Sequence, residues 1–162
     1  MTNPALLPGN TPVTVSGAPD ARLTAGTIGR GVQRLLAAQG FESLSEFPLG
    51  NGRRAYVIGL GPPGTIWIVE IKSSTADFRA DHKWPEYRDY CDAFFFAVAL
   101  DFPHAILPAY AGLILADAYG GEIVRAAPET PLAAARRKAI VLSFARAAAA
   151  RLRGLDDPGQ FI

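Results

Sequence analysis

A glutamate and a lysine lie two residues apart at the end of the apolar run IWIVEIKSS, residues 66–74. Side chains alternate along a strand, so Glu70 and Lys72 project from the same face. Neither charge is stable when buried alone, so each must be paired, solvated or bound to a ligand. A carboxylate here can hold Mg²⁺ or Mn²⁺, and a nearby lysine can steady an attacking water or a phosphate charge. The alternative is an ordinary surface ion pair where the strand reaches solvent.

Metal chemistry at this strand end would require a second carboxylate on the neighbouring strand. The preceding apolar segment carries Tyr56 and no acid. A loop at GNG would pair Leu49 with Arg53, and counting back from that pair places Glu46 opposite Tyr56 on the same sheet face. Glu46 is then the candidate second metal ligand beside Glu70, although a one-residue slip would send it to the other face. The alternatives are an exposed strand carboxylate and an aromatic ring packed over the sheet end.

Basic and aromatic residues flank this strand end. Arg53 and Arg54 precede the position of the missing acid, and Lys83, Tyr87 and Tyr90 follow at the spacing of one helical stripe. Such a stripe could hold a phosphate backbone and stack on an unpaired base. The alternative places the aromatic rings in the core and the lysine in solvent.

Asp77 and Asp81 lie four residues apart, and one of them can cap the helix; the alternative is that either is a displaced metal ligand. The basic cluster at residues 136–138 on the last helix is compatible with an ordinary solvated face.

The pattern of apolar residues predicts the elements that position these groups. An amphipathic helix should begin at Thr24 or Thr27 and end at Gly40. Glycine-containing loops then predict three antiparallel strands joined by hairpins. A polar stretch predicts a short helix and a second one over about residues 82–91, before two strands covered on both faces and a hairpin through GG. A last helix over residues 131–152 has four apolar anchors, Leu132, Ile140, Leu142 and Phe144.

This order of elements predicts an α/β fold, with a mixed central sheet flanked by helices on both sides. One domain is sufficient for 162 residues. Residues 1–20 contain four prolines and no periodicity, so we expect a flexible arm. The domain should span residues 21–153, and residues 154–162 should form a tail.

Composition limits the classes of partner. The formal charge of +1 means that nucleic-acid binding would require a local basic patch. The single cysteine, Cys91, cannot form an internal disulfide, which is compatible with a reducing compartment. The chain has no secretion-signal pattern at its start and no apolar run near the ~20 residues that span a bilayer. We therefore expect a soluble, cytoplasmic protein with no membrane partner.

Several segments together resemble a known family. The E-x-K sequence that follows Tyr56 by 14 residues is similar to the PD-(D/E)XK nuclease superfamily, whose core is a helix, a β-meander, a helix and a further strand. More closely, the chain from about Gly29 to Leu152 resembles the MmcB-like DNA-repair proteins of bacteria. The segments that carry this resemblance are GRRA, IWIVEIKSS, DFRAD, KWPEYRDYCD, FFFAV and ARRKA.

The resemblance implies a restriction-endonuclease-like core and a site for phosphodiester hydrolysis. It makes Glu70 a ligand of Mg²⁺ or Mn²⁺ and Lys72 the catalytic lysine, and it implies DNA and other repair proteins as partners. The third catalytic position is Tyr56, where the family pattern expects an aspartate. A neutral phenol is a poor ligand for a hard cation. The first expected helix also lacks the acid found in many superfamily nucleases.

Three hypotheses follow from these observations. The first is a divalent-metal-dependent endonuclease or exonuclease of DNA repair, using Glu70, Lys72 and Glu46. The second is a catalytically degenerate module that binds DNA or acts as an adaptor. The third is a structural partner in a repair assembly that makes no nucleic-acid contact.

Overall fold

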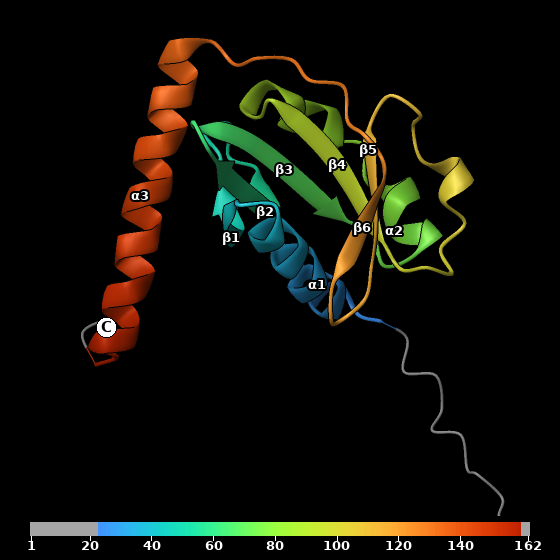
Figure 1. Cartoon of the computed structure of the whole chain (residues 1–162), viewed down its shortest axis with the longest axis horizontal. Coiled ribbons are helices and arrows are strands. Elements are labelled where there is room, and N and C mark those ends of the chain that lie inside the picture. The colour runs from blue at the N-terminus through green and yellow to red at the C-terminus, as the bar shows by residue number, and fades with distance from the viewer. Residues whose placement is uncertain (1–22, 160–162) are drawn as a thin grey trace, which may run out of the picture.

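The computed structural model describes residues 23–159 and contains a six-stranded mixed sheet with helices on both faces (Figure 1). The strands follow one another across the sheet in chain order. The first three form an antiparallel meander, the third, fourth and fifth are parallel, and the sixth is antiparallel to the fifth. This confirms the predicted α/β class and is consistent with a restriction-endonuclease-like core. The strands are β1 (Glu42–Pro48), β2 (Arg54–Gly61), β3 (Thr65–Ile71), β4 (Ala93–Val98), β5 (Gly112–Ala116) and β6 (Gly121–Arg125).

Glycine-containing turns build the meander as the sequence predicts. At the GNG turn, the backbone N–H of Leu49 donates to the carbonyl of Arg53 over 2.8 Å, and Gly52 has φ of 79°. At the GPPG turn, Gly64 has φ of 101°. Both glycines occupy a backbone region that residues with a side chain rarely adopt, so these turns depend on glycine.

Alternation along the strands divides the apolar residues into two cores, one on each face. The helix α1 (Ala25–Ala38) begins after Thr24, whose side chain caps it, and buries one apolar stripe against the first face. The opposite face is covered by aromatic and aliphatic residues from three other elements and from the loop after β4. β4 is buried along its whole length, as its continuous apolar run predicts. The three covering elements are α2 (Thr75–Ala80), the 3₁₀ helix η1 (Trp84–Tyr90) and α3 (Ala134–Asp156). The loop contributes Phe102 and Leu107, on either side of the short 3₁₀ helix η2 (His104–Ile106).

A charge pair fixes α3 to the body of the protein. Two guanidinium nitrogens of Arg137 lie 2.6 Å from the two carboxylate oxygens of Asp92. The same carboxylate accepts the backbone N–H groups of Ile66 and Leu132. Burial alone would raise the pKa of Asp92, but these hydrogen bonds lower the pKa below its usual value. The pair thus joins the N-terminal turn of α3 to the start of β3.

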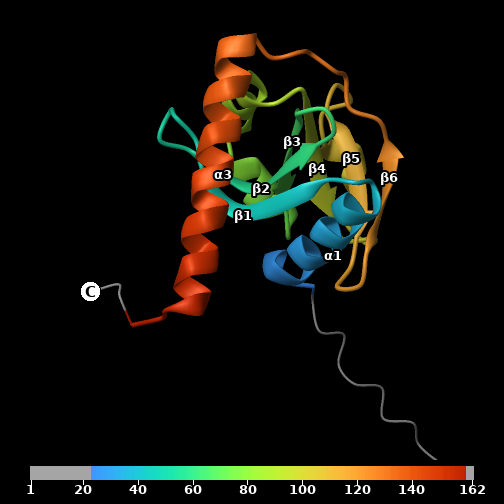
Figure 2. The ribbon, with the colours of Figure 1, turned by 60° about the vertical axis from the view of Figure 1, so that its left-hand side comes forward.

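The long C-terminal helix differs in part from the prediction. Ile140 and Phe144 are buried anchors, but Leu142 is 56 % exposed because it lies on the far side of the helix from Ile140. The helix continues to Asp156, into the segment expected to be a tail. Figure 2 shows α3 running past the edge of the sheet at β1.

Two other expectations concern the N-terminal arm and the absence of a membrane span. The expected arm at residues 1–20 lies outside the described residues. Within residues 23–159, no helix combines the length and the apolar character needed to cross a membrane.

Candidate functional site

The E-x-K residues lie at the carboxyl end of β3, beside the buried strand β4. Glu70 is 8 % exposed and Lys72 is 4 % exposed. The backbone N–H of Lys72 donates to the carbonyl of Ala97, and the chain then turns into α2, which Ser74 caps. The two charges are therefore not an exposed surface pair, and each requires a partner inside the protein.

The ammonium of Lys72 is paired with Asp81, the residue that ends α2. Lys72 Nζ lies 2.6 Å from Asp81 Oδ2, and Asp81 Oδ1 accepts the backbone N–H of Lys83. Burial would raise the pKa of Asp81, but the hydrogen bonds from Lys72 and Lys83 lower it overall. Asp77 instead accepts the backbone N–H of Ser73 at the start of α2. Of the two aspartates, Asp77 thus supports the N-terminal turn of α2, whose N-cap is Ser74, and Asp81 is both the C-cap residue and the partner of the lysine.

Glu70 has much weaker hydrogen-bond partners than Lys72. Its Oε2 accepts one long hydrogen bond, 3.5 Å from the backbone nitrogen of Tyr56. Burial raises the pKa of Glu70 to about 7. Lys72 and the Tyr56 N–H act in the opposite direction, whereas Asp81 and Glu46 raise the pKa further. Near neutral pH, this carboxyl group is therefore divided between its neutral and charged forms.

The hairpin has the predicted register, but regular alternation fails where Glu46 lies opposite Tyr56. Glu46 has φ of 51°, and ladder pairs form on either side of this position. The ring of Tyr56 packs on the face covered by α1, where a Cβ added to Gly29 would lie 3.1 Å from the ring. Glu70 has the same parity along β3 as Ile68, which belongs to the other core. The ring of Tyr56 is therefore directed toward α1, while the backbone of the same residue adjoins the Glu70 carboxylate.

The donor atoms in this arrangement do not fit a hard divalent cation. Glu46 is exposed, with its Oε2 3.9 Å from Arg54 Nε, although it is near enough to raise the pKa of Glu70. The carboxylate of Asp81 is neutralised by Lys72, and burial raises the pKa of Tyr56 so that its phenol stays neutral. In residues 23–159, no three His, Cys, Asp or Glu side chains are grouped so that they could hold a metal ion. Mg²⁺ requires several charged or carbonyl oxygens at short range.

The 3₁₀ geometry of η1 rearranges the aromatic residues that follow. With three residues per turn, residues 84, 87 and 90 share one face. Trp84 and Tyr87 are buried, Tyr90 is half-buried, and Lys83 is exposed outside the helix. The stripe of Lys83, Tyr87 and Tyr90 therefore does not form, because the prediction assumed an α-helix.

Tyr87 is part of the core. Its ring is stacked with Phe94 at a centroid distance of 6.2 Å, and its hydroxyl donates to the carbonyl of Arg54. Burial raises the pKa of Tyr87 to about 12, and Glu70 and Asp81 act in the same direction. Tyr87 therefore presents no free face to a base.

The two arginines before Tyr56 differ in their availability. Arg53 makes two hydrogen bonds to the carboxylate of Glu86, of 2.9 and 3.0 Å. The Arg54 side chain is 60 % exposed. Of the five residues predicted to bind DNA, Arg54 and Lys83 are the exposed cations beside the E-x-K pair, and Tyr90 lies farther along η1.

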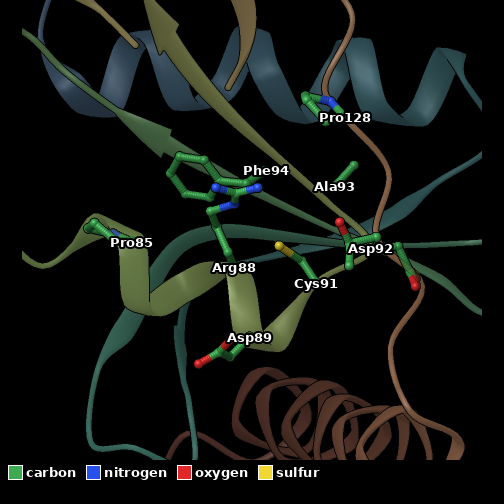
Figure 3. A pocket seen from close by; sticks show the side chains of 9 residues that line it. Pro85, Arg88, Asp89, Cys91, Asp92, Ala93, Phe94 and Pro128 are labelled. Atoms are coloured by element: carbon green, nitrogen blue, oxygen red, sulfur yellow. The ribbon is translucent and has the colours of Figure 1, made fainter. Parts of the chain in front are cut away.

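A separate cavity of about 290 Å³ opens beside η1 (Figure 3). Figure 3 shows Arg88 extending over Phe94 and the sulfur of Cys91 pointing toward the cavity. Burial raises the pKa of the Cys91 thiol to about 12, so it is no nucleophile at neutral pH. The carboxylate of Asp92 is occupied by Arg137.

Sequence reasoning did not identify two charge pairs that organise this region, Lys72–Asp81 and Asp92–Arg137. Each joins residues from different elements. Their only sequence signal is that they lie in segments that carry the family resemblance, DFRAD, KWPEYRDYCD and ARRKA.

Comparisons with known proteins agree with the resemblance found in the sequence. A family model described as DNA repair protein MmcB-like matches residues 11–159. No curated protein matches the chain. The solved structure of the SPO1766 protein of unknown function from Silicibacter pomeroyi is 51 % identical, with a TM-score of 0.82. That similarity covers 85 % of this chain and 94 % of the other.

Proposed function

The chain belongs to the MmcB-like family of DNA repair proteins, and from this premise we propose that it binds DNA during repair without cutting it. The family membership gives the role in DNA repair. The absence of cleavage is our inference from the site at the end of β3. In this account, the buried E-x-K pair takes no part in cleavage, and exposed cations make the DNA contacts.

The observation that carries this proposal is that the Lys72 side chain is buried and paired with Asp81. Its ammonium is 2.6 Å from Asp81, and the residue is 4 % exposed. A lysine that stabilises a transition state must reach the scissile phosphate. To do so, Lys72 would have to leave a buried partner, and Asp81 would then lose its counter-charge.

The position of Tyr56 supports the same conclusion. A second carboxylate beside Glu70 would complete a pair of oxygen ligands, but Tyr56 supplies a neutral phenol whose ring packs against α1. The chain therefore has no side chain at this position that could share a cation with Glu70.

Metal-dependent cleavage is a second candidate, favoured by one observation. Asp81 and Glu46 lie near enough to Glu70 to raise its pKa, and the Glu70 carboxyl accepts one long hydrogen bond. Clustered acids without sufficient partners are stabilised by a cation. For this candidate to hold, Glu70 and Glu46 would bind Mg²⁺ or Mn²⁺, and Asp81 would release Lys72.

Binding titrations in EDTA and in Mg²⁺ test the proposal. We expect single-stranded, nicked or branched DNA to bind equally well in both, because no metal ion takes part. The logarithm of the affinity should fall linearly with the logarithm of the salt concentration. The Arg54→Gln and Lys83→Gln variants should each reduce that slope by a fraction of a unit up to about one unit.

Two results would reject the proposal. Binding that requires Mg²⁺ and is lost in Glu70→Gln would favour the metal-dependent site. No binding to any of these DNA structures at low salt would favour a structural role in a repair assembly.

A further inference from the structure

Basic residues are concentrated on α3. This helix carries six of the 16 lysines and arginines of the chain but only one of its 15 acidic residues. A protein of formal charge +1 requires a local patch to attract a polyanion, and α3 is such a patch. The six basic residues are Arg136, Arg137, Lys138, Arg146, Arg151 and Arg153.

Two of these arginines have structural tasks. Arg137 is paired with Asp92, and Arg151 donates to the carbonyl of Ser45 over 2.6 Å. Arg136 and Arg146 are exposed. Residues 136, 139, 143 and 146 follow one line along the helix, because steps of three and four residues keep the same face.

The residues between these two arginines are small. Ala139 and Ser143 occupy the line, so no long side chain stands between Arg136 and Arg146. Ten residues of helix separate the arginines by about 15 Å. A nucleic-acid backbone can therefore approach the helix closely between two positive charges.

A pocket of about 210 Å³ opens beside this line and is lined by residues of α3 and of the turn after β1. The side chains of Phe47 and Leu49 form an apolar wall of the pocket, and Ser143 contributes a hydroxyl group. Tyr90 of η1 and Arg136 of α3 also line the pocket. The pocket thus combines apolar walls with an aromatic ring and a cation.

The position of Arg136 is fixed at this pocket. Its guanidinium carbon lies 5.1 Å from the centroid of the Tyr90 ring, and a guanidinium nitrogen donates to the carbonyl of Asp89 over 2.9 Å. Arginine planes and aromatic rings are the surfaces on which proteins stack unpaired bases. The ring and the guanidinium are therefore already arranged for stacking.

We propose that this α3 groove, formed by Tyr90, Arg136, Ser143 and Arg146 with the adjoining pocket, binds single-stranded DNA. One unpaired base enters the pocket and stacks at Tyr90 and Arg136, while neighbouring phosphates lie along the line from Arg136 to Arg146. A base inside a duplex has both faces covered by its neighbours, so the groove selects unpaired nucleotides. The inference rests on the proposed DNA binding and specifies the kind of DNA and the surface.

Fluorescence anisotropy with a labelled oligothymidine and a matched duplex tests this inference. Tyr90→Leu keeps the apolar volume and removes the ring, so oligothymidine affinity should fall roughly 5- to 150-fold with the salt slope unchanged. Arg146→Gln should reduce the salt slope for the single strand by about 0.7. Arg30→Gln changes the net charge equally at an exposed position on α1, and should behave as wild type.

The outcomes separate this inference from the proposed function. If wild type binds neither DNA, the proposed function fails and the groove fails with it. If wild type binds single strands but Tyr90→Leu and Arg146→Gln match Arg30→Gln, only the groove is wrong. Tighter binding of the duplex than of the single strand would also overturn the groove. Arg146 is exposed, so its variant remains informative even if Tyr90→Leu does not fold.

Discussion

At the end of β3, two buried charges of opposite sign have very different partners. Lys72 has a short contact with Asp81, whereas Glu70 has one 3.5 Å hydrogen bond from a backbone N–H. The result is a lysine held by a short ion pair and a carboxyl group whose pKa is about 7. This imbalance can be measured through stability.

Replacing Glu70 by glutamine should stabilise the protein at high pH. The folded state raises the pKa of Glu70 from 4.5 to about 7, so it binds the proton more tightly than the unfolded chain does. Ionisation therefore costs stability as pH rises through this interval, and the full cost, about 3 kcal/mol, applies above it. Glutamine cannot ionise, so Glu70→Gln should be more stable than wild type at pH 8 and nearly equal to it at pH 4.5. Urea denaturation across this range measures the difference. A difference that does not change with pH would contradict the assigned pKa.

Tyr56→Asp should create a metal-responsive site. The backbone nitrogen of Tyr56 lies 3.5 Å from the Glu70 carboxylate, and it is the distal ring atoms that reach α1. Aspartate is too short to make that contact, so its carboxylate would lie close to Glu70. Two adjacent carboxylates bind Mn²⁺ far better than one. We expect Mn²⁺ at 100 times its dissociation constant to stabilise this variant by about 2.7 kcal/mol, detected as a rise in Tm. Tyr56→Phe is the matched control and should not respond. An equal rise in wild type would show that the natural site already binds metal.

Part of this site was predicted from the sequence. Alternation correctly placed Glu70 and Lys72 together at a strand end, and the hairpin register correctly placed Glu46 opposite Tyr56. The sequence could not reveal the φ of 51° at Glu46, which breaks the alternation. Nor could it identify Asp81 as the partner of Lys72, because that contact depends on where α2 ends.

Among the elements, α3 is attached by buried anchors and by the charge pair of Arg137 with Asp92. Arg137→Ala would leave the carboxylate of Asp92, whose side chain is 9 % exposed, without its counter-charge. Leaving a buried charge unpaired costs about 3 kcal/mol. We expect a loss of this size in urea denaturation, together with faster hydrogen exchange in the first turns of α3. Lys138→Ala changes an exposed neighbour and should cost little. Equal stability of the two variants would refute the role of the pair.

The packing of α1 on the β5–β6 turn requires glycine at residue 31. A Cβ at Gly31 would lie 1.9 Å from the carbonyl oxygen of Asp117 and 2.6 Å from that of Gly120. These are backbone atoms and cannot rotate away, so Gly31→Ala should destabilise the protein by about 3 kcal/mol or more. Gly26→Ala, in the same helix, meets nothing nearer than 3.9 Å and should be neutral or stabilising. Thermal denaturation of the two variants checks this, and similar Tm values would contradict it.

Element types followed from the sequence where local signals were strong. Three signals were sufficient to predict the correct type of element. They are the threonine that caps α1, the two glycine turns and the continuous apolar run of β4. The 3₁₀ form of η1 was not recognised, because Pro85 and the aromatic residues fit either helix type. Leu142 on the far side of α3 was wrongly predicted to be an anchor, because helix propensity does not say which face of a helix is buried.

On the scale of the whole molecule, charge is unevenly divided. α3 is strongly basic, while most acidic residues belong to the rest of the chain. The E-x-K residues are buried at the end of β3, whereas the α3 groove is open to solvent. The sequence gives the total charge and the basic cluster at residues 136–138, but only the fold brings α3 beside Tyr90 and the β1–β2 turn.

Absence of DNA cleavage is the central claim, and one assay tests it most directly. Wild type and Glu70→Ala, each in molar excess over end-labelled single-stranded, nicked and branched DNA, are incubated with Mg²⁺ or Mn²⁺ and analysed on denaturing gels. The account predicts that wild type binds the DNA but gives no more product than Glu70→Ala. Metal-dependent product from wild type that disappears in Glu70→Ala would contradict the account and establish a working nuclease site.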